Sequence, residues 1–308
     1  MYTREASSIE RRTLGLFKPK TPNGAEPNRP LWLTILNSLY YVLVVVAVVA
    51  FIYYLYTFQV SDDPAKQNKL LLYLPVLLQG AGVTIIISII SMILATILGF
   101  IGALGRLSRF APIRWLATSY VEIVRGTPIL VQLLLWYYGV GFVLSNLGFD
   151  PYGLAFQVMT TLQSNSLVPD QFNGYFYGVI GLSFNYGAYL TEVFRSGISS
   201  VEKGQTEAAL SLGLNATQVT RRIVLPQAIR ITIPPFTNYF ITLIQDSALL
   251  SILSIIELDH QTFALALPQT DASIKFFVFI LGAILYLAIC YPLALLARFL
   301  EARIAKAY

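Results

Sequence analysis

The stretch EAALSLGLNATQVTRRIVLP, at residues 207–226, is moderately polar and lies between two long apolar segments. Its first half is rich in good helix formers, and Gly213 suits the end of a helix. Asn215 can cap a second helix, because Gln218 three residues later completes the pattern of a capping box. The stretch therefore predicts two short helices that stay outside the bilayer.

Residues at both ends of this stretch have expected places. Glu207 is expected in the first turn of the first helix, where a carboxylate favours the positive helix end. Pro226 is expected to start the next long helix, because its missing N–H is harmless there. Ala208 and Ala209 are small enough for close approach by a partner. From the local pattern alone, a solvated linker fits the stretch as well as a docking surface does.

The composition is that of an α-helical membrane protein. Apolar residues make up 56% of the chain and charged residues 12%, and the mean hydropathy is +0.65. A soluble domain carries about 25% charged residues. Several apolar runs exceed the roughly 20 residues that cross a bilayer as a helix. We therefore expect an all-α, polytopic membrane protein in which the net charge of +5 marks cytoplasmic loops rather than a nucleic-acid site.

The apolar pattern predicts about six transmembrane helices behind a basic tail at residues 1–31. Breaks are expected at Gly126–Pro128 in the third segment and at Pro234–Pro235 in the fifth. The expected segments are about 32–58, 72–104, 115–144, 175–197, 228–256 and 275–297.

The basic residues predict the orientation. With the N-terminus inside, six spans return the C-terminus to the same face, and that face carries seventeen Lys or Arg residues. The opposite face carries three, and Arg125 lies within a segment. This asymmetry is typical of the positive-inside rule and places residues 198–226 in the cytoplasm.

Several motifs carry a resemblance to a known family. Glu207–Ala208–Ala209, Gly213 and the Leu225–Pro226 pair together resemble the EAA loop of ABC-importer permeases. Four further stretches resemble the polar amino-acid uptake branch, the histidine/glutamine permease-like family. They are RGTPILVQ (125–132), NYGAYLTEVFR (185–195), PPFTNYFI (234–241) and DSALLS (246–251).

The resemblance covers roughly residues 75–300 and implies a five-span type I importer core within residues 72–300. The helix at 32–58 is then an additional N-terminal span, and residues 198–226 are the cytoplasmic coupling loop. The loop at 145–174 is longer than is usual in the family. Gln245 stands where a Lys often precedes the Asp. The coupling residues that the resemblance implies are Glu207, Ala208, Ala209, Gly213, Leu225 and Pro226.

Charged residues within the apolar segments need partners, because a charge in mid-bilayer costs at least about 2.5–3.5 kcal/mol. Glu122 with Arg125, and Glu192 with Arg195, are three residues apart and can pair on one helix face. The alternative is that some of the polar groups in the segments line a substrate path. The candidates for a path that binds a zwitterion are Asn185, Tyr189, Glu192, Gln245 and Asp246.

No phosphate-binding loop, catalytic triad or metal-ligand cluster stands out in the sequence. His260 is interpreted as an outer loop residue rather than a metal ligand, and Cys290 as a buried apolar residue. The resemblance implies that this chain has no cofactor of its own, because partner ATPase subunits bind ATP and magnesium. It also implies a second permease subunit, identical or homologous, and an extracytoplasmic amino-acid-binding protein.

The leading hypothesis is thus the permease subunit of an ATP-driven importer for polar amino acids, in a bacterial cytoplasmic membrane. One alternative is a secondary transporter in which Glu192 and Asp246 relay ions. Another is a membrane scaffold that transports nothing. The sequence does not choose among the amino acids, nor between a homodimer and a heterodimer.

Overall fold

The computed structural model describes residues 31–148, 157, 160–161 and 175–305, and the regular structure in these ranges is helical. The predicted all-α class is therefore confirmed. The basic tail and most of the 145–174 loop lie outside the described residues. The chain divides into two compact units, Met1–Asn68 and Lys69–Tyr308, and each is described by itself.

The first unit contains one long helix, α2 (Leu31–Gln59). Its extent agrees with the segment expected at 32–58. Side chains such as Val46, Val49 and Ile52 are 58–60% exposed, so the helix presents an apolar surface to its surroundings. Such a surface suits lipid. That α2 crosses a membrane stays a prediction.

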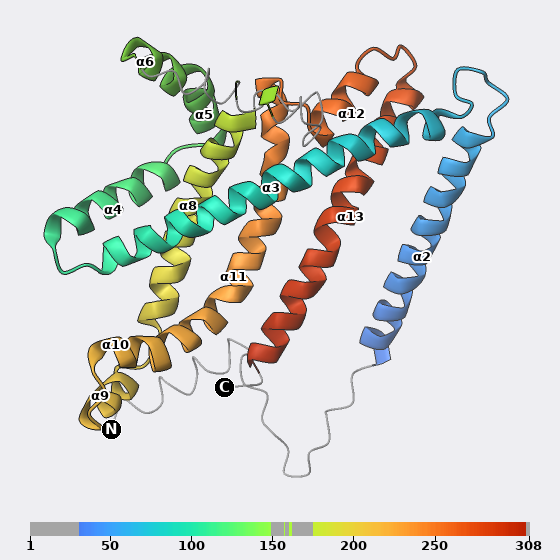
Figure 1. Ribbon diagram of the computed structural model, residues 1–308. Coiled ribbons are helices and arrows are strands. Elements are labelled where there is room, and N and C mark those ends of the chain that lie inside the picture. Colours follow the sequence, from blue (N-terminus) through green and yellow to red (C-terminus); the bar gives the residue numbers. More distant parts are fainter. Residues whose placement is uncertain (1–30, 149–156, 158–159, 162–174, 306–308) are drawn as a thin grey trace, which may run out of the picture. The chain divides into compact units, whose positions relative to one another are not determined.

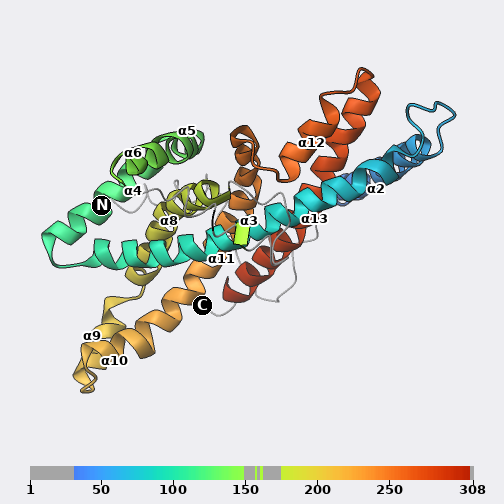
Figure 2. The ribbon, with the colours of Figure 1, turned by 45° about the horizontal axis from the view of Figure 1, so that its top comes forward.

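The second unit is organised around α3 (Lys69–Leu107), a helix of 39 residues. Figures 1 and 2 show α3 running across the other long helices of the unit, and it contacts helices before and after it in the chain. Its partners are α4 (Ala111–Arg125), α8 (Tyr175–Ser199), α11 (Leu225–Asp246), α12 (Leu258–Ala266) and α13 (Ala272–Ala305).

Glycines bring α3 and α8 together. A Cβ atom at Gly99 would lie 2.6 Å from the Leu190 Cβ, and one at Gly102 would collide with the Thr191 hydroxyl. Small residues allow this close backbone approach, which is typical of helices packed inside membranes. The core beside this contact is formed by Ile87, Met92 and Ala95 of α3, Leu182, Tyr186, Leu190 and Val193 of α8, Leu243 of α11, and Leu133, Leu250, Leu253 and Ile255.

The predicted break at Gly126–Pro128 is confirmed. Helix α4 ends at Arg125, and the chain then turns by 108° into α5 (Ile129–Leu134). Pro128 precedes α5 in an extended conformation, with φ −63° and ψ 135°. The chain continues through a π-helical turn, η1 (Leu135–Val140), into α6 (Gly141–Asn146).

The predicted break at Pro234–Pro235 is wrong, because both prolines lie inside the continuous helix α11. A proline has the φ angle that a helix needs, although it removes its own N–H donor and crowds the carbonyl four residues earlier. Membrane helices tolerate that loss when neighbouring groups compensate for it. The prolines therefore leave the Arg230 and Ile231 carbonyls without their usual helical donors but do not end the helix.

Within the described ranges, α3 and α13 are long and apolar enough to cross a membrane, and the number rises to four if each of two bent helix pairs counts as one span. One pair is α4 with the helix after the 108° turn, and the other joins the helix ending at Leu253 to α12 with a 52° bend. Helix α8 has 25 residues but carries more polar groups, many of them buried against other helices. The number six stays a prediction.

Candidate functional site

The stretch at 198–226 forms an exposed helical elbow, which we call the coupling segment. Its first helix, α9 (Lys203–Ser211), is followed two residues later by Gly213, whose φ is +85°. The Leu214 N–H donates to the Ala209 carbonyl at 3.2 Å, and the Gly213 N–H donates to the Leu210 carbonyl at 3.0 Å. These two bonds form a Schellman motif, so the predicted role of Gly213 as a helix terminator is confirmed.

The second helix, α10 (Ala216–Val219), begins with the predicted capping box. The Gln218 N–H donates to Asn215 Oδ1, and the Asn215 N–H donates to Gln218 Oε1, both at 2.9 Å. Two backbone donors that a helix start leaves unpaired are thus satisfied within the segment. The turn between α9 and α10 is therefore fixed by its own hydrogen bonds.

One finer prediction about the coupling segment is wrong. Glu207 is the fifth residue of α9 rather than part of its first turn, because the helix begins earlier than the pattern suggested, directly after Glu202 at the N-cap. The prediction for Pro226 is confirmed, because it lies in the first turn of α11, and a π-helical turn, η2 (Thr220–Val224), joins α10 to that helix. In this wider turn the N–H of Leu225, the residue directly before Pro226, donates to the Thr220 carbonyl.

The coupling segment is exposed where a partner could reach it. Leu212 is 83% exposed and Leu210 47%, whereas Ala209 is buried beneath them. Gln227 Nε2 donates to Gln205 Oε1 at 2.6 Å, which ties α9 to the start of α11. Figures 1 and 2 show α9 and α10 together at one end of the second unit, with α12 at the opposite end.

A buried amide pair links the broken helix to α8. Gln132 Nε2 donates to the Val124 carbonyl at 2.7 Å and to the Thr127 hydroxyl at 2.8 Å. Asn185 Nδ2 donates to Gln132 Oε1 at 3.1 Å. Asn185, a candidate for the substrate path, is 3% exposed. In this structure it anchors the chain turn that follows α4.

Three tyrosines gather beside Asp246, where α8 meets α11. The Tyr186 hydroxyl donates to Asp246 Oδ2 at 2.6 Å. The Tyr189 ring centroid lies 5.4 Å from that of Tyr239, and the Arg125 guanidinium lies 5.3 Å from the Tyr189 ring centroid. The structure thus brings together Tyr189 and Asp246 with an aromatic cluster and a cation. Gln245 is exposed, next to Asp246 in the chain.

Glu192 lies in an ion-pair network between α3 and α8. It accepts from Arg106 on α3 and, at 2.8 Å, from Arg195 one turn further along α8. The predicted pairing of Glu192 with Arg195 is confirmed. Arg106 is a partner that the sequence did not indicate, because it lies 86 positions away.

Glu257 is a buried carboxylate that the sequence analysis missed. It is 0% exposed and accepts from Thr84 of α3 at 3.1 Å and from Tyr286 of α13 at 2.9 Å. It also caps α12, where the His260 N–H donates to it at 2.8 Å. An acidic residue directly after the largely apolar run SILSII (251–256) was the available signal. Glu257 therefore joins three helices at the end of the unit opposite the coupling segment.

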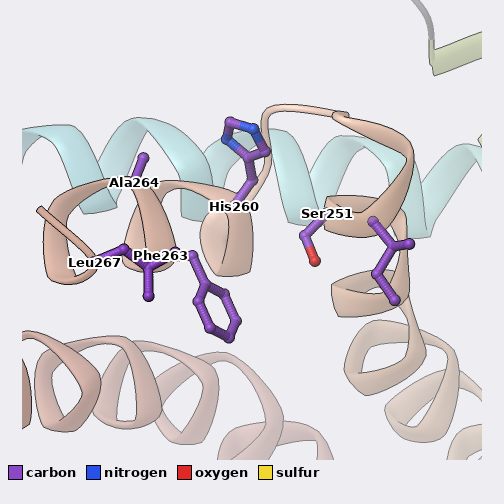
Figure 3. Close-up of a pocket in the computed structure, with 6 residues that line it drawn as sticks. Ser251, His260, Phe263, Ala264 and Leu267 are labelled. Carbon is purple, nitrogen blue, oxygen red and sulfur yellow. The ribbon is translucent and has the colours of Figure 1, made fainter.

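Figure 3 shows a hollow lined by residues of α12 together with Ser251 and Ile252. His260 belongs to helix α12 rather than to a loop, which corrects the prediction. Among the described residues, no group of three or more His, Cys, Asp or Glu side chains could hold a metal ion. The hollow is lined by Ser251, Ile252, His260, Phe263, Ala264 and Leu267, a largely apolar set.

A bundle of apolar helices with buried polar contacts and an exposed, internally capped elbow defines the membrane subunit of a transporter. Residues 95–306 match the family described as "Binding-protein-dependent transport system inner membrane component". This chain therefore belongs to that family. It is the inner-membrane permease subunit of an ABC importer, which works with separate ATPase subunits and a substrate-binding protein.

Similar proteins support this assignment. The probable amino-acid ABC transporter permease YckA of Bacillus subtilis (strain 168) is 36% identical over 231 residues, which are 75% of this chain and 90% of that protein. The L-cystine transport system permease TcyB of the same organism is 35% identical over 232 residues, 75% of this chain and 88% of that protein. An ion-gradient carrier is not supported by these relatives.

Solved structures agree on the fold. A structure described as "Crystal structure of an amino acid ABC transporter with histidines" is 29% identical, with a TM-score of 0.62, and covers 76% of this chain and 96% of that one. The inward-facing MetNI methionine transporter is 18% identical, with a TM-score of 0.54, and covers 74% and 97%. The second likeness concerns the fold alone.

Proposed function

We propose that this chain carries polar amino acids into the cell as one permease half of an ATP-driven importer. The names of its relatives support an amino-acid substrate, because they include a cystine permease and probable glutamine permeases. The chain itself contributes polar side chains between α8 and α11 that suit a zwitterion.

The coupling segment is proposed to face the cytoplasm and to receive force from the ATPase. The observation that carries this proposal is an exposed elbow whose two helices are capped internally and whose second helix continues into α11. A rigid segment transmits a movement of the ATPase to the attached membrane helices, whereas a flexible loop would not. The residues proposed for coupling are Glu207, Ala208, Ala209, Gly213, Leu225 and Pro226.

The substrate path is proposed to run along the contact between α8 and α11. Asp246 offers an acceptor for an ammonium group, and the aromatic rings of Tyr189 and its neighbours offer an apolar surface for a side chain. Glu192, which is paired with Arg106 and Arg195, is proposed to hold α8 in place beside the path. Asn185 positions this wall of the path through Gln132. Gln245 is exposed and next to Asp246, where it can meet a polar substrate.

The complete importer is proposed to contain two permease halves, identical or homologous, with ATP and magnesium bound in the ATPase subunits. An extracytoplasmic binding protein delivers the substrate. Both termini lie in the cytoplasm of a bacterial cell, and residues 72–300 form the importer core. The helix at 32–58 adds one span, behind the basic tail at 1–31.

In the proposed mechanism, movement of the coupling segment drives transport. Closure of the ATPase dimer on ATP draws the two coupling segments together, so that the attached helices rotate and the path opens outward to the binding protein. ATP hydrolysis releases the segments, and the path opens inward. Because α10 and α11 form one continuous helix, a displacement of the elbow moves α11 with it.

Substitution of Gly213 tests this function. Gly213→Val places a β-branched residue at a φ of +85°, which is strained, whereas Gly204→Ala adds a methyl group to open space in α9. The wild-type permease and the Gly204→Ala variant are expected to co-purify with a defined ATPase subunit and to take up amino acid with ATP. Gly213→Val should lose both. Uptake that persists without ATP but stops when the ion gradient is collapsed would overturn the proposal.

A further inference from the structure

The coupling segment carries a basic hollow beside its apolar tip. Arg221 and Arg222 lie on the π-helical turn that joins α10 to α11, and both are exposed. The capping box of α10 forms the other side and fixes its shape. The residues that line the hollow are Asn215, Thr217, Gln218, Arg221 and Arg222. We call this feature the basic hollow.

The two arginines have no ion-pair partner among residues 31–148 and 175–305. Arg106 and Arg195, by contrast, share the carboxylate of Glu192. Both guanidinium groups line the hollow, so an anion bound there gains charge neutralisation and hydrogen bonds. Arginine is well suited to this, because its fork of N–H donors matches a carboxylate bidentately.

The position of the basic hollow along the helix favours a protein over a lipid headgroup. Arg230 is also exposed and lies eight residues beyond Arg222 on the same continuous helix, about 12 Å further along at 1.5 Å per residue. The apolar side chain next to it, Ile229, is 54% exposed, and we infer that contact with lipid begins near this position. On this inference Arg230 is assigned to the headgroup level and the basic hollow to the water outside it.

An apolar tip accompanies the charge. Leu212 is 83% exposed at the turn between α9 and α10, although it lies in a segment that water surrounds. Exposed apolar groups rimmed by polar ones are typical of protein interfaces. The segment thus presents an apolar centre with cations at one side.

We propose that the basic hollow receives carboxylate side chains of the ATPase subunit, at the rim of an apolar contact centred on Leu210 and Leu212. This inference rests on the proposed coupling function and names the chemistry of the partner surface. The partner is expected to carry an apolar cleft with acidic residues on one side. Charges at a rim chiefly speed association and make it sensitive to salt.

The test compares two charge reversals in the full-length permease. The double variant Arg221→Glu/Arg222→Glu is set against Arg230→Glu and against the charge-preserving Arg221→Lys/Arg222→Lys. Each is placed in nanodiscs of phosphatidylcholine alone and of phosphatidylcholine with phosphatidylglycerol. The affinity of the purified ATPase subunit that co-purifies with the wild type is measured at 50 and 500 mM KCl, and thermal unfolding checks that every variant is folded.

The double reversal should weaken binding at least about tenfold at 50 mM KCl and remove most of the salt dependence, because salt screens exposed charges. The lysine pair should keep most of the affinity, and Arg230→Glu should bind like the wild type. Wild-type binding that the double reversal leaves unchanged overturns this inference alone. A loss confined to discs with phosphatidylglycerol assigns the hollow to lipid and also overturns it. Absence of wild-type binding would instead contradict the proposed function.

Discussion

At the scale of single residues, Gln132 stabilises a break that would otherwise leave backbone groups unpaired. The 108° turn after α4 leaves carbonyls without helical donors, and Gln132 supplies a donor to the Val124 carbonyl. Its own carbonyl oxygen is occupied by Asn185. One buried side chain thus satisfies a helix end and fixes its position against α8. A buried polar network of this kind is stabilising only when each member is satisfied.

Gln132→Leu is expected to lower the free energy of unfolding by roughly 1–3 kcal/mol, because Asn185 and the Val124 carbonyl lose their partner in a buried site. Thermal unfolding in detergent measures the loss. Asn185→Leu should cost a similar amount, and the double variant less than the sum, since both changes break one contact. Strictly additive losses would show that the two amides act independently.

At the scale of secondary-structure elements, the contact between α3 and α8 depends on shape and charge together. Gly99 and Gly102 let the helices approach, and the Arg106–Glu192 contact joins them near the cytoplasmic side of the proposed topology. Helix α8 leads directly into the coupling segment, so this contact stabilises the position at which the coupling segment begins. Close packing at small residues and one ion pair hold these two helices together, whereas soluble helix bundles depend on a large apolar interface.

Substitution of Gly102 tests the close approach. Gly102→Val forces the Thr191 side chain and the two helices apart, and we expect a loss of about 1–3 kcal/mol in stability. Gly82→Val on the same helix is the matched control, because its Cβ would meet nothing within 4 Å. Equal unfolding temperatures for the two variants would contradict the packing described above.

Charge exchange tests the ion pair. Arg106→Glu places two carboxylates together in a half-buried site and should destabilise the protein and reduce ATP-driven uptake. Adding Glu192→Arg restores one attractive contact, and the double variant is expected to recover part of the stability, measured by thermal unfolding. No recovery would show that neither residue depends on the other. Arg109→Glu, at an exposed position on the loop after α3, serves as the control for added charge.

At the scale of the whole molecule, the sequence predicted the features of the coupling segment that depend on neighbouring residues. It did not predict contacts between residues that are distant in the chain. Gly213 and the Asn215–Gln218 box follow from neighbouring residues, so the sequence alone located them. The pairing of Arg106 with Glu192 joins positions 86 residues apart and has no local signal. Pro234–Pro235 misled because the break was inferred from two neighbouring residues, whereas the long helix α11 continues through both prolines.

The central claim is that the coupling segment faces the cytoplasm and is covered by the ATPase. In a Cys290→Ala background, Ser211→Cys on α9 and Ser273→Cys at the start of α13 are two exposed, nearly isosteric probes. A membrane-impermeant maleimide should label position 273 in intact cells. It should label position 211 only in inside-out vesicles, and added ATPase should protect that position. Labelling of position 211 in intact cells, or no protection by the ATPase, would contradict the account.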